Sequence, residues 1–222
     1  MNQFTERHYQ ALLTYLKDGL RSGKLKDGSK LPSEQELADR LSFSVPSLRE
    51  AMHLLEMFGL LTPDADGSFR ISHDVSRGFT DVFSMMLLLN QLDYTEVIRM
   101  RRSIELQSLA AICRNITETQ KSNLYLSLMR MMASPHGDRK ADIQFHDILI
   151  SASCDKLAIR LHQALSQFTG YNSVGRQGDD EFYYAGNWDE IVQTHAQIYQ
   201  SVIDGRPEKA AEAVYAHYDF LL

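Results

Sequence analysis

Between Ser33 and Gly59 the sequence predicts two short amphipathic helices with only a tight turn between them. Ser33 is a natural N-cap, and Glu36 completes a capping box three residues later. Ser44 can cap the next helix, and Pro46 suits the first turn of that helix. The apolar residues that follow the helical period are Leu37, Ala38, Leu41, Leu48, Ala51, Met52, Leu55 and Phe58. Each helix is therefore expected to bury one face against other elements.

The flanking segments predict one further helix and a hairpin. Residues 5–22 carry apolar side chains at helical spacing. Residues 60–62 and 69–71 are typical of two short strands around an Asp-Gly turn. Three helices followed by a hairpin make a winged helix-turn-helix, which we place at residues 1–75.

The remainder of the chain, residues 76–222, predicts a second domain that is entirely helical. No convincing strand pattern occurs in it. We expect six or seven helices, near residues 79–91, 93–115, 117–133, 138–153, 155–169, 188–204 and 207–221. The predicted fold class is thus mostly α, with a winged helix-turn-helix in front of an all-α bundle.

The composition favours a cytoplasmic protein without membrane contact. The N-terminus has no basic start followed by an apolar stretch, and the densest apolar run, Met85 to Leu89, is too short to span a bilayer. Cys113 and Cys154 lie outside any Cys-x-x-Cys pattern, so neither a disulfide framework nor a zinc ribbon is indicated. We therefore expect a reducing compartment.

The charge argues against indiscriminate binding to nucleic acid. The 222 residues carry a formal net charge of -6, and residues 1–75 hold nine Lys and Arg against eleven Asp and Glu. Specific binding is still compatible with this balance, because phosphate contacts depend on positive groups gathered on one face.

The first domain resembles the GntR family of regulators, whose pattern covers about 60 residues. The matching residues are Gly28, Leu31-Pro32-Ser33-Glu34, Glu36-Leu37-Ala38, Arg49-Glu50-Ala51, Leu55 and Gly59-Leu60. The second domain, residues 76–222, is similar to that of the FadR-type branch of this family. In that branch an all-helical domain with a metal site, the FCD domain, binds a ligand. Its marks stand here at Arg101-Arg102, Glu105, Asp142, Phe145-His146, His195 and His217.

This sequence departs from the family pattern in the first domain. Gln35 and Val45 stand where the family usually has arginines, and Pro46 stands where a threonine is common. Ala65 replaces one of two wing glycines. The operator sequence therefore cannot be carried over from relatives.

The N-terminal half of a recognition helix enters the major groove, where side chains reach base edges. Ser44, Ser47 and Arg49 occupy that half, and Arg49 can fork onto the O6 and N7 atoms of guanine. An ion pair within the helix is a poor explanation of Arg49, because Glu50 is adjacent and Glu56 is seven residues on.

Four further residues complete the predicted DNA-contacting set. Lys30 and Arg70 are candidate contacts to the DNA backbone, from the segment before the second helix and from the wing. Ser33 and Gln35, at the start of the second helix, are included with them.

Three histidines and one aspartate predict a divalent metal site. His195 and His217 fall in the middle of apolar stripes on the last two helices, at similar heights in an antiparallel hairpin. Asp142 and His146 lie four residues apart on one helix face, beside a buried stripe. Carboxylate and neutral imidazole suit Zn, Ni, Mn or Fe. The alternative for any one of these histidines is a hydrogen-bonded core residue, and His8, His53, His73, His136 and His162 are interpreted in that way.

Arg101 belongs to an otherwise apolar stripe, so its guanidinium points toward the interior, where it needs an anion. The anion is either Glu105, four residues on, or the carboxylate of a bound ligand. The spacing does not decide between them, and the family resemblance favours the ligand. Glu105 itself is better explained as a partner of Arg101 than as a general base.

These features predict a homodimeric transcription regulator, interpreted as a repressor although the sequence does not name the sign of regulation, that binds a palindromic operator in double-stranded DNA. A small carboxylate or sugar acid, bound by the metal and Arg101, would control operator affinity. One alternative is a metalloenzyme fused to a DNA-binding domain, but no obvious general base accompanies the metal set. The other alternative is a DNA-binding module whose second domain only dimerises.

Overall fold

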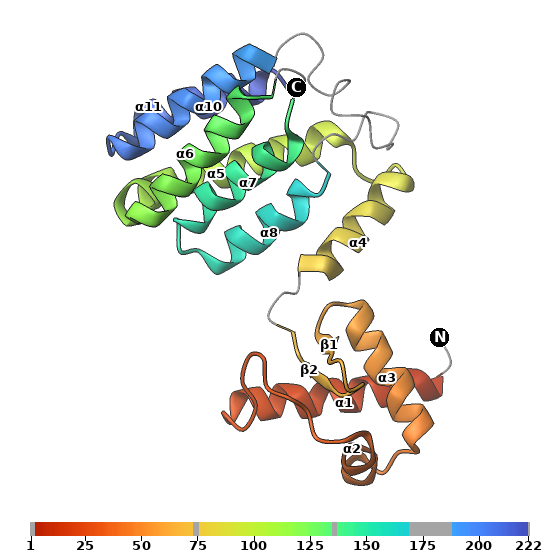
Figure 1. The fold of residues 1–222 in the computed structure, drawn as a ribbon. Helices are drawn as coiled ribbons and strands as arrows, with labels where there is room; N and C mark the ends of the chain where they lie inside the picture. Colours follow the sequence, from red (N-terminus) through yellow and green to blue (C-terminus); the bar gives the residue numbers. More distant parts are fainter. Residues whose placement is uncertain (1–2, 73–75, 135–136, 169–187, 222) are drawn as a thin grey trace. The chain divides into compact units, whose positions relative to one another are not determined.

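The computed structural model describes residues 3–72, 76–134, 137–168 and 188–221 (Figure 1). Its contacts divide the chain into two units, residues 1–79 and 80–222. The division falls inside helix α4, Ser76–Leu88. Each unit has its own hydrophobic core.

The first unit is a winged helix-turn-helix, as predicted. Its elements are α1 (Gln3–Arg21), α2 (Glu34–Leu41), α3 (Val45–Met57), β1 (Leu61–Pro63) and β2 (Phe69–Ile71). The two strands are antiparallel, with Leu61 opposite Ile71. Side chains from α1, α2 and α3 meet in a core that includes Leu12, Leu37 and Leu48.

Local capping explains where α2 and α3 begin. The Ser33 hydroxyl accepts the Glu36 N–H while the Glu36 carboxylate accepts the Ser33 N–H, which is the predicted capping box. The Ser44 hydroxyl accepts the Ser47 N–H in the same way. Ser42 ends α2 with a φ of 57°, and this left-handed residue makes the turn to α3 short.

Within the described residues the second unit is all helical, in agreement with the predicted fold class. After α4 come α5 (Tyr94–Asn115), α6 (Glu118–Met132), α7 (Arg139–Ser151), α8 (Lys156–Ser166), α10 (Trp188–Ile203) and α11 (Pro207–Asp219). α4 begins three residues before the predicted start. It also ends earlier than predicted, because Asn90 adopts a φ of 53° that stops a helix.

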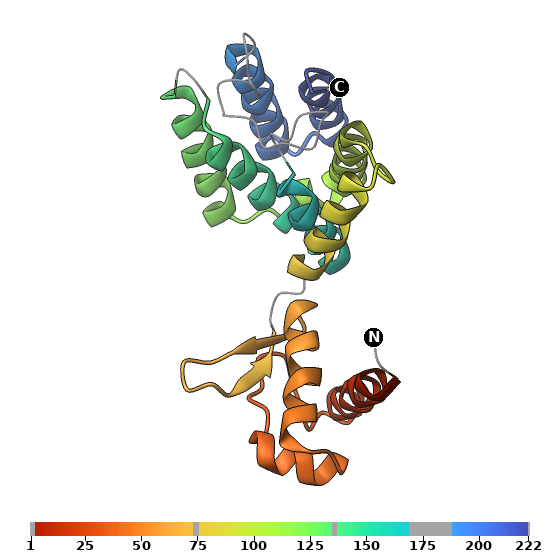
Figure 2. The same cartoon turned by 90° about the vertical axis from the view of Figure 1, so that its right-hand side faces the viewer.

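Pairs of neighbouring helices build this bundle. α6 packs along α7, and α10 packs along α11, with α5 against α11, α8 and α7 (Figure 2). The core between them includes Phe145, Leu149, Ile198 and Val214, all fully buried.

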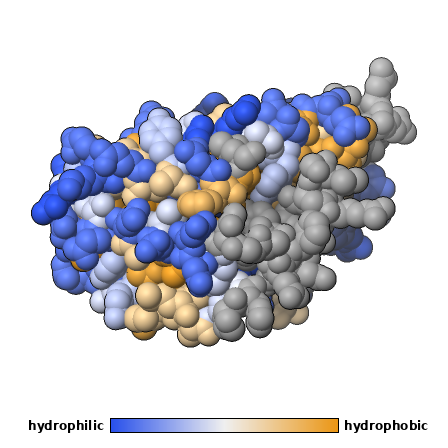
Figure 3. Space-filling view, turned by 90° about the horizontal axis from the view of Figure 1, so that it is seen from above, coloured by the Kyte–Doolittle hydropathy of each residue, from blue (hydrophilic) through white to orange (hydrophobic). Residues whose placement is uncertain are grey.

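Apolar side chains also reach the surface. Figure 3 shows one face of the molecule, on which apolar patches lie among hydrophilic side chains. Across the described ranges, no helix combines the length and the apolar character needed to cross a membrane.

Candidate metal centre and nucleic-acid interface

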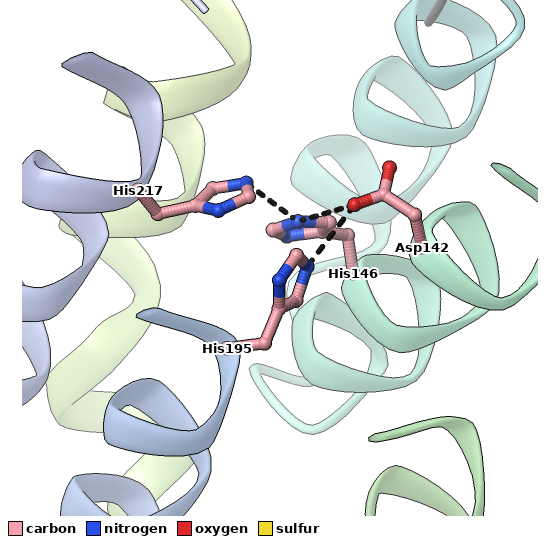
Figure 4. A group of neighbouring side chains, drawn as sticks. All are labelled: Asp142, His146, His195 and His217. Carbon is pink, nitrogen blue, oxygen red and sulfur yellow. Dashed lines mark hydrogen bonds and ion pairs between the residues drawn. The ribbon is translucent and has the colours of Figure 1, made fainter. Parts of the chain in front are cut away.

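The structure brings together the four residues that the sequence singled out as metal ligands. Asp142 and His146 come from successive turns of α7, His195 from α10 and His217 from α11 (Figure 4). All four side chains are buried, and one ligand atom from each lies within 4.8 Å of the others. Gly205, with a φ of 68°, makes the tight turn that places α10 and α11 side by side.

The outer nitrogen of each imidazole faces a hydrogen-bond acceptor. His146 Nδ1 lies 2.8 Å from Glu105 Oε1, and His195 Nδ1 lies 2.8 Å from the carbonyl oxygen of Ile191. His217 Nδ1 lies 3.2 Å from the Thr194 hydroxyl, which donates its own proton to Ile191 O at 2.7 Å. These acceptors favour the hydrogen on Nδ1 of each ring, and a neutral ring in that tautomer presents a lone pair on Nε2.

These lone pairs point at one another. His146 Nε2 and His217 Nε2 are 3.1 Å apart, and His195 Nε2 is 3.1 Å from Asp142 Oδ1. His146 Nε2 is 3.8 Å from the same carboxylate oxygen. Four converging acceptor atoms of this kind favour a cation at the centre. Three imidazoles and one carboxylate fit a divalent transition metal.

The pKa values of these side chains favour the protonation states that bind a cation. Burial lowers the pKa of His146, although Glu105 acts in the opposite direction. Burial, His195 and His146 together hold the pKa of His217 well below its usual value. Burial would raise the pKa of Asp142, but the three surrounding histidines outweigh it and lower that pKa. Without a metal, the site thus offers neutral imidazoles at His146 and His217 and an ionised carboxylate at Asp142 at neutral pH.

Glu105 does more than the sequence indicated. Its Oε1 atom lies 2.8 Å from each of three donors: His146 Nδ1, His162 Nε2 and Tyr218 Oη. The expectation that Glu105 serves only as a partner of Arg101 is therefore incomplete. It also supports a candidate metal ligand.

His162 was interpreted as a core histidine, and it is indeed fully buried and hydrogen-bonded. No pattern in the sequence predicts its connection through Glu105 to the metal set. The one local signal is Ser166, four residues later on the buried face of α8, whose hydroxyl lies 3.2 Å from His162 Nδ1. His8 is half-buried against the Phe43 ring and His53 is exposed beside Glu56, so neither is the core histidine expected, whereas His73 and His136 lie outside the described residues.

Arg101 is buried on α5, one turn before Glu105. Its guanidinium carbon lies 5.8 Å from the centre of the Tyr218 ring. Because Tyr218 also donates to Glu105, the charge of Arg101 lies beside the polar network that surrounds the metal set. This placement is compatible with an anion-binding role.

The predicted DNA-contacting cations are all engaged with carboxylates in the first unit. Lys30 Nζ lies 2.7 Å from Asp66, and Arg70 makes two hydrogen bonds to Asp64, at 2.7 and 2.8 Å. Arg49 donates from Nε and Nη2 to Glu34 of α2. Among the described residues of α3, Arg49 thus has no ion-pair partner, as the spacing predicts, but it does pair with a carboxylate of the neighbouring helix, which spacing along α3 alone does not predict.

The four uncharged residues of this set mainly organise the two helices. Ser33 and Ser44 are the N-caps of α2 and α3, and Ser47 Oγ lies 2.8 Å from Ser44 Oγ. Gln35 donates to Asp39 within α2. The capping hydroxyls share the helix N-termini with the groups that would face DNA.

Together, the winged helix-turn-helix and the helical unit with its buried Asp/His cluster define a two-domain DNA-binding regulator. Residues 8–71 match the model for bacterial regulatory proteins of the gntR family, and residues 96–220 match the FCD domain. The chain belongs to the GntR family, in the FadR-type branch that carries an FCD domain.

Known proteins similar to this chain are transcription regulators and not enzymes. The uncharacterised HTH-type transcriptional regulator YcbG of Bacillus subtilis is 28% identical over 91% of this chain and 83% of its own length. The putative L-lactate dehydrogenase operon regulatory protein of Escherichia coli is 26% identical over 89% of this chain and 78% of its own. The structure of Streptococcus agalactiae GntR has the same fold, with a TM-score of 0.65 at 20% identity over 97% of both chains.

Proposed function

We propose that this protein is a cytoplasmic repressor that releases its operator when a small organic acid binds at a metal site in the helical unit. The observation that carries the proposal is the convergence of four acceptor atoms, from Asp142, His146, His195 and His217, in a buried position. Since these atoms repel one another without a cation, the site favours one divalent metal per chain, of the Zn, Ni, Mn or Fe type.

Four protein ligands leave coordination positions open on a metal that accepts five or six, and a bound metal would offer these to an organic acid. The chain supplies a second anchor in Arg101, whose fixed positive charge suits a carboxylate. The relative named for an L-lactate dehydrogenase operon makes small hydroxy acids the first compounds to test.

For DNA binding, we propose that α3 enters the major groove by its N-terminal half, so that Ser44, Ser47 and Arg49 contact the DNA. Lys30, Arg70, Ser33 and Gln35 would make the flanking contacts. One short helix contacts too few bases to specify a genomic site. We therefore propose a homodimer that reads two half-sites of a palindrome, and repression follows if the bound dimer blocks the promoter.

The test begins with selection of the operator from genomic fragments by the metal-loaded protein. Operator affinity is then measured by fluorescence anisotropy with and without each candidate acid, for metal-loaded and chelator-treated protein. The proposal expects a metal-dependent loss of affinity with at least one acid. If no acid changes the affinity and no metal co-purifies, the second unit serves only for dimerisation. A transcription assay with the same operator decides between repression and activation.

A further inference from the structure

We propose that Glu105, His162 and Tyr218 form an outer support for the metal site, in which a single carboxylate oxygen fixes the orientation of the ligand His146. This inference rests on the proposed metal site. It adds residues that do not touch the metal themselves and assigns them control over how firmly the metal is held.

The first step is the geometry around Glu105 Oε1. Three donors lie 2.8 Å from this one oxygen: His146 Nδ1 from α7, His162 Nε2 from α8 and Tyr218 Oη from α11. Glu105 itself comes from α5, so the oxygen ties four helices together. Both histidines and Glu105 have no exposed side-chain surface, so no water competes for these contacts.

The second step concerns what holds the carboxylate in place. Glu105 has several rotatable bonds, and it can keep His146 in one orientation only if it is itself fixed. His162 provides that fixation from the other side. Its own ring is held at Nδ1, which lies 3.2 Å from Ser166 Oγ and 3.4 Å from Asp147 Oδ1.

The third step is the consequence for the metal. With its hydrogen on Nδ1, 2.8 Å from Glu105 Oε1, His146 presents a lone pair on Nε2 toward His217 Nε2 and Asp142. Without a fixed Glu105, His146 could rotate or place its hydrogen on Nε2. Either change removes one donor from the site before a metal arrives. The support set is therefore expected to raise metal affinity without contributing a ligand.

The experiment measures Zn²⁺ affinity of the full chain by competition with a chromophoric chelator. We compare wild type with Glu105→Gln, His162→Leu, His162→Gln and Tyr218→Phe. Loss of such an outer contact commonly weakens metal binding by about 10- to 100-fold. We expect a loss of that size for Glu105→Gln and His162→Leu, and a smaller one for Tyr218→Phe. His162→Gln restores a donor and should recover part of the affinity.

A second readout separates positioning from general stability. A purely structural role would lower the Tm of the metal-free and Zn²⁺-loaded protein equally, leaving the Zn²⁺-induced rise in Tm unchanged. Positioning predicts a smaller rise in the variants. Ser127→Ala is the matched control, because it removes a buried hydroxyl that bonds Asn123 O within α6. It should keep the wild-type Zn²⁺ affinity.

Each result has a distinct meaning. If wild type binds no Zn²⁺, Ni²⁺, Mn²⁺ or Fe²⁺, the proposed metal site is wrong and the support role falls with it. If wild type binds a metal and Glu105→Gln and His162→Leu bind it equally well, only the support role is refuted. Should His162→Leu fail to fold, Tyr218→Phe and His162→Gln still decide the question.

Discussion

His146 Nε2 and His217 Nε2 face each other at 3.1 Å, although the outer partner of each ring leaves both nitrogens as acceptors. Packing alone would not favour two lone pairs at this distance in a buried site. The contact is therefore best explained by a cation that belongs between them, and the first two predictions follow from it.

Protein purified without chelator should carry close to one divalent metal per chain. His195→Ala and His217→Ala should each reduce the metal content and lower the Tm, because removing a ligand leaves the remaining buried acceptors unsatisfied. Elemental analysis and thermal unfolding of the same samples measure both quantities. Full metal loading in the His195→Ala/His217→Ala double variant would contradict the assignment.

The metal-free protein should lose stability as the pH falls below about 6.5. Burial lowers the pKa of His146 and His217 in the folded protein. Their contribution to the free energy of unfolding is therefore fully present above the pKa of an unfolded histidine, and it is lost at lower pH because the unfolded state takes up protons there. Each such histidine contributes a slope of at most about 1.4 kcal/mol per pH unit.

Burial would lower the pKa of His162, but Asp147 and Glu105 raise it, so the contribution of His162 to the pH dependence of stability has the opposite sign.

Comparison of wild type with His217→Gln isolates the effect of His217. Urea unfolding between pH 7.5 and 5 in the presence of chelator should show a flatter pH dependence for this variant. An identical dependence in both proteins would show that His217 is not held neutral.

Arg49→Ala should reduce operator affinity by about 1–3 kcal/mol and relax specificity at one guanine. Glu34→Gln is the informative partner variant, since it releases Arg49 from its ion pair. If Arg49 reads DNA, Glu34→Gln should bind at least as tightly as wild type. If Arg49 only joins α2 to α3, both variants should instead lower stability and leave affinity per folded molecule unchanged.

Asp66→Asn should strengthen DNA binding, because Asp66 holds Lys30 at 2.7 Å and competes with phosphate for it. Anisotropy titrations at several salt concentrations should show that the logarithm of the association constant for DNA falls more steeply with the logarithm of salt concentration than in wild type, by about 0.9 in slope. Glu212→Gln makes the same change in net charge at an exposed position of the second unit and serves as the control. Equal gains in both variants would indicate a nonspecific charge effect.

Arg101→Ala should retain the metal but abolish the response of DNA binding to the effector acid. The reason is that an allosteric coupling of about 1–3 kcal/mol requires a contact to the effector, and the alanine removes it. Metal content and operator affinity with and without the acid are the two measurements. An effector response equal to that of wild type would exclude Arg101 from the ligand site.

The sequence by itself determined where α2 and α3 begin and which of their faces are buried. Ser33, Glu36 and Ser44 act on backbone groups within one turn, so their effect can be read without knowing the fold. His195 and His217 were recognisable because a polar residue in the centre of an apolar stripe must point inward. The spacing of Asp142 and His146 on one helix face needed no tertiary information.

The tertiary structure alone decided which distant groups share a contact. Glu105 Oε1 meets His162, 57 residues away, and Tyr218, 113 residues away, and no local pattern encodes such pairings. In the same way, Arg49 finds Glu34 on another helix, where spacing along α3 gave no partner. Capping and periodicity depend on neighbours within a few residues, whereas these contacts depend on how whole helices pack, and packing is a property of the complete chain.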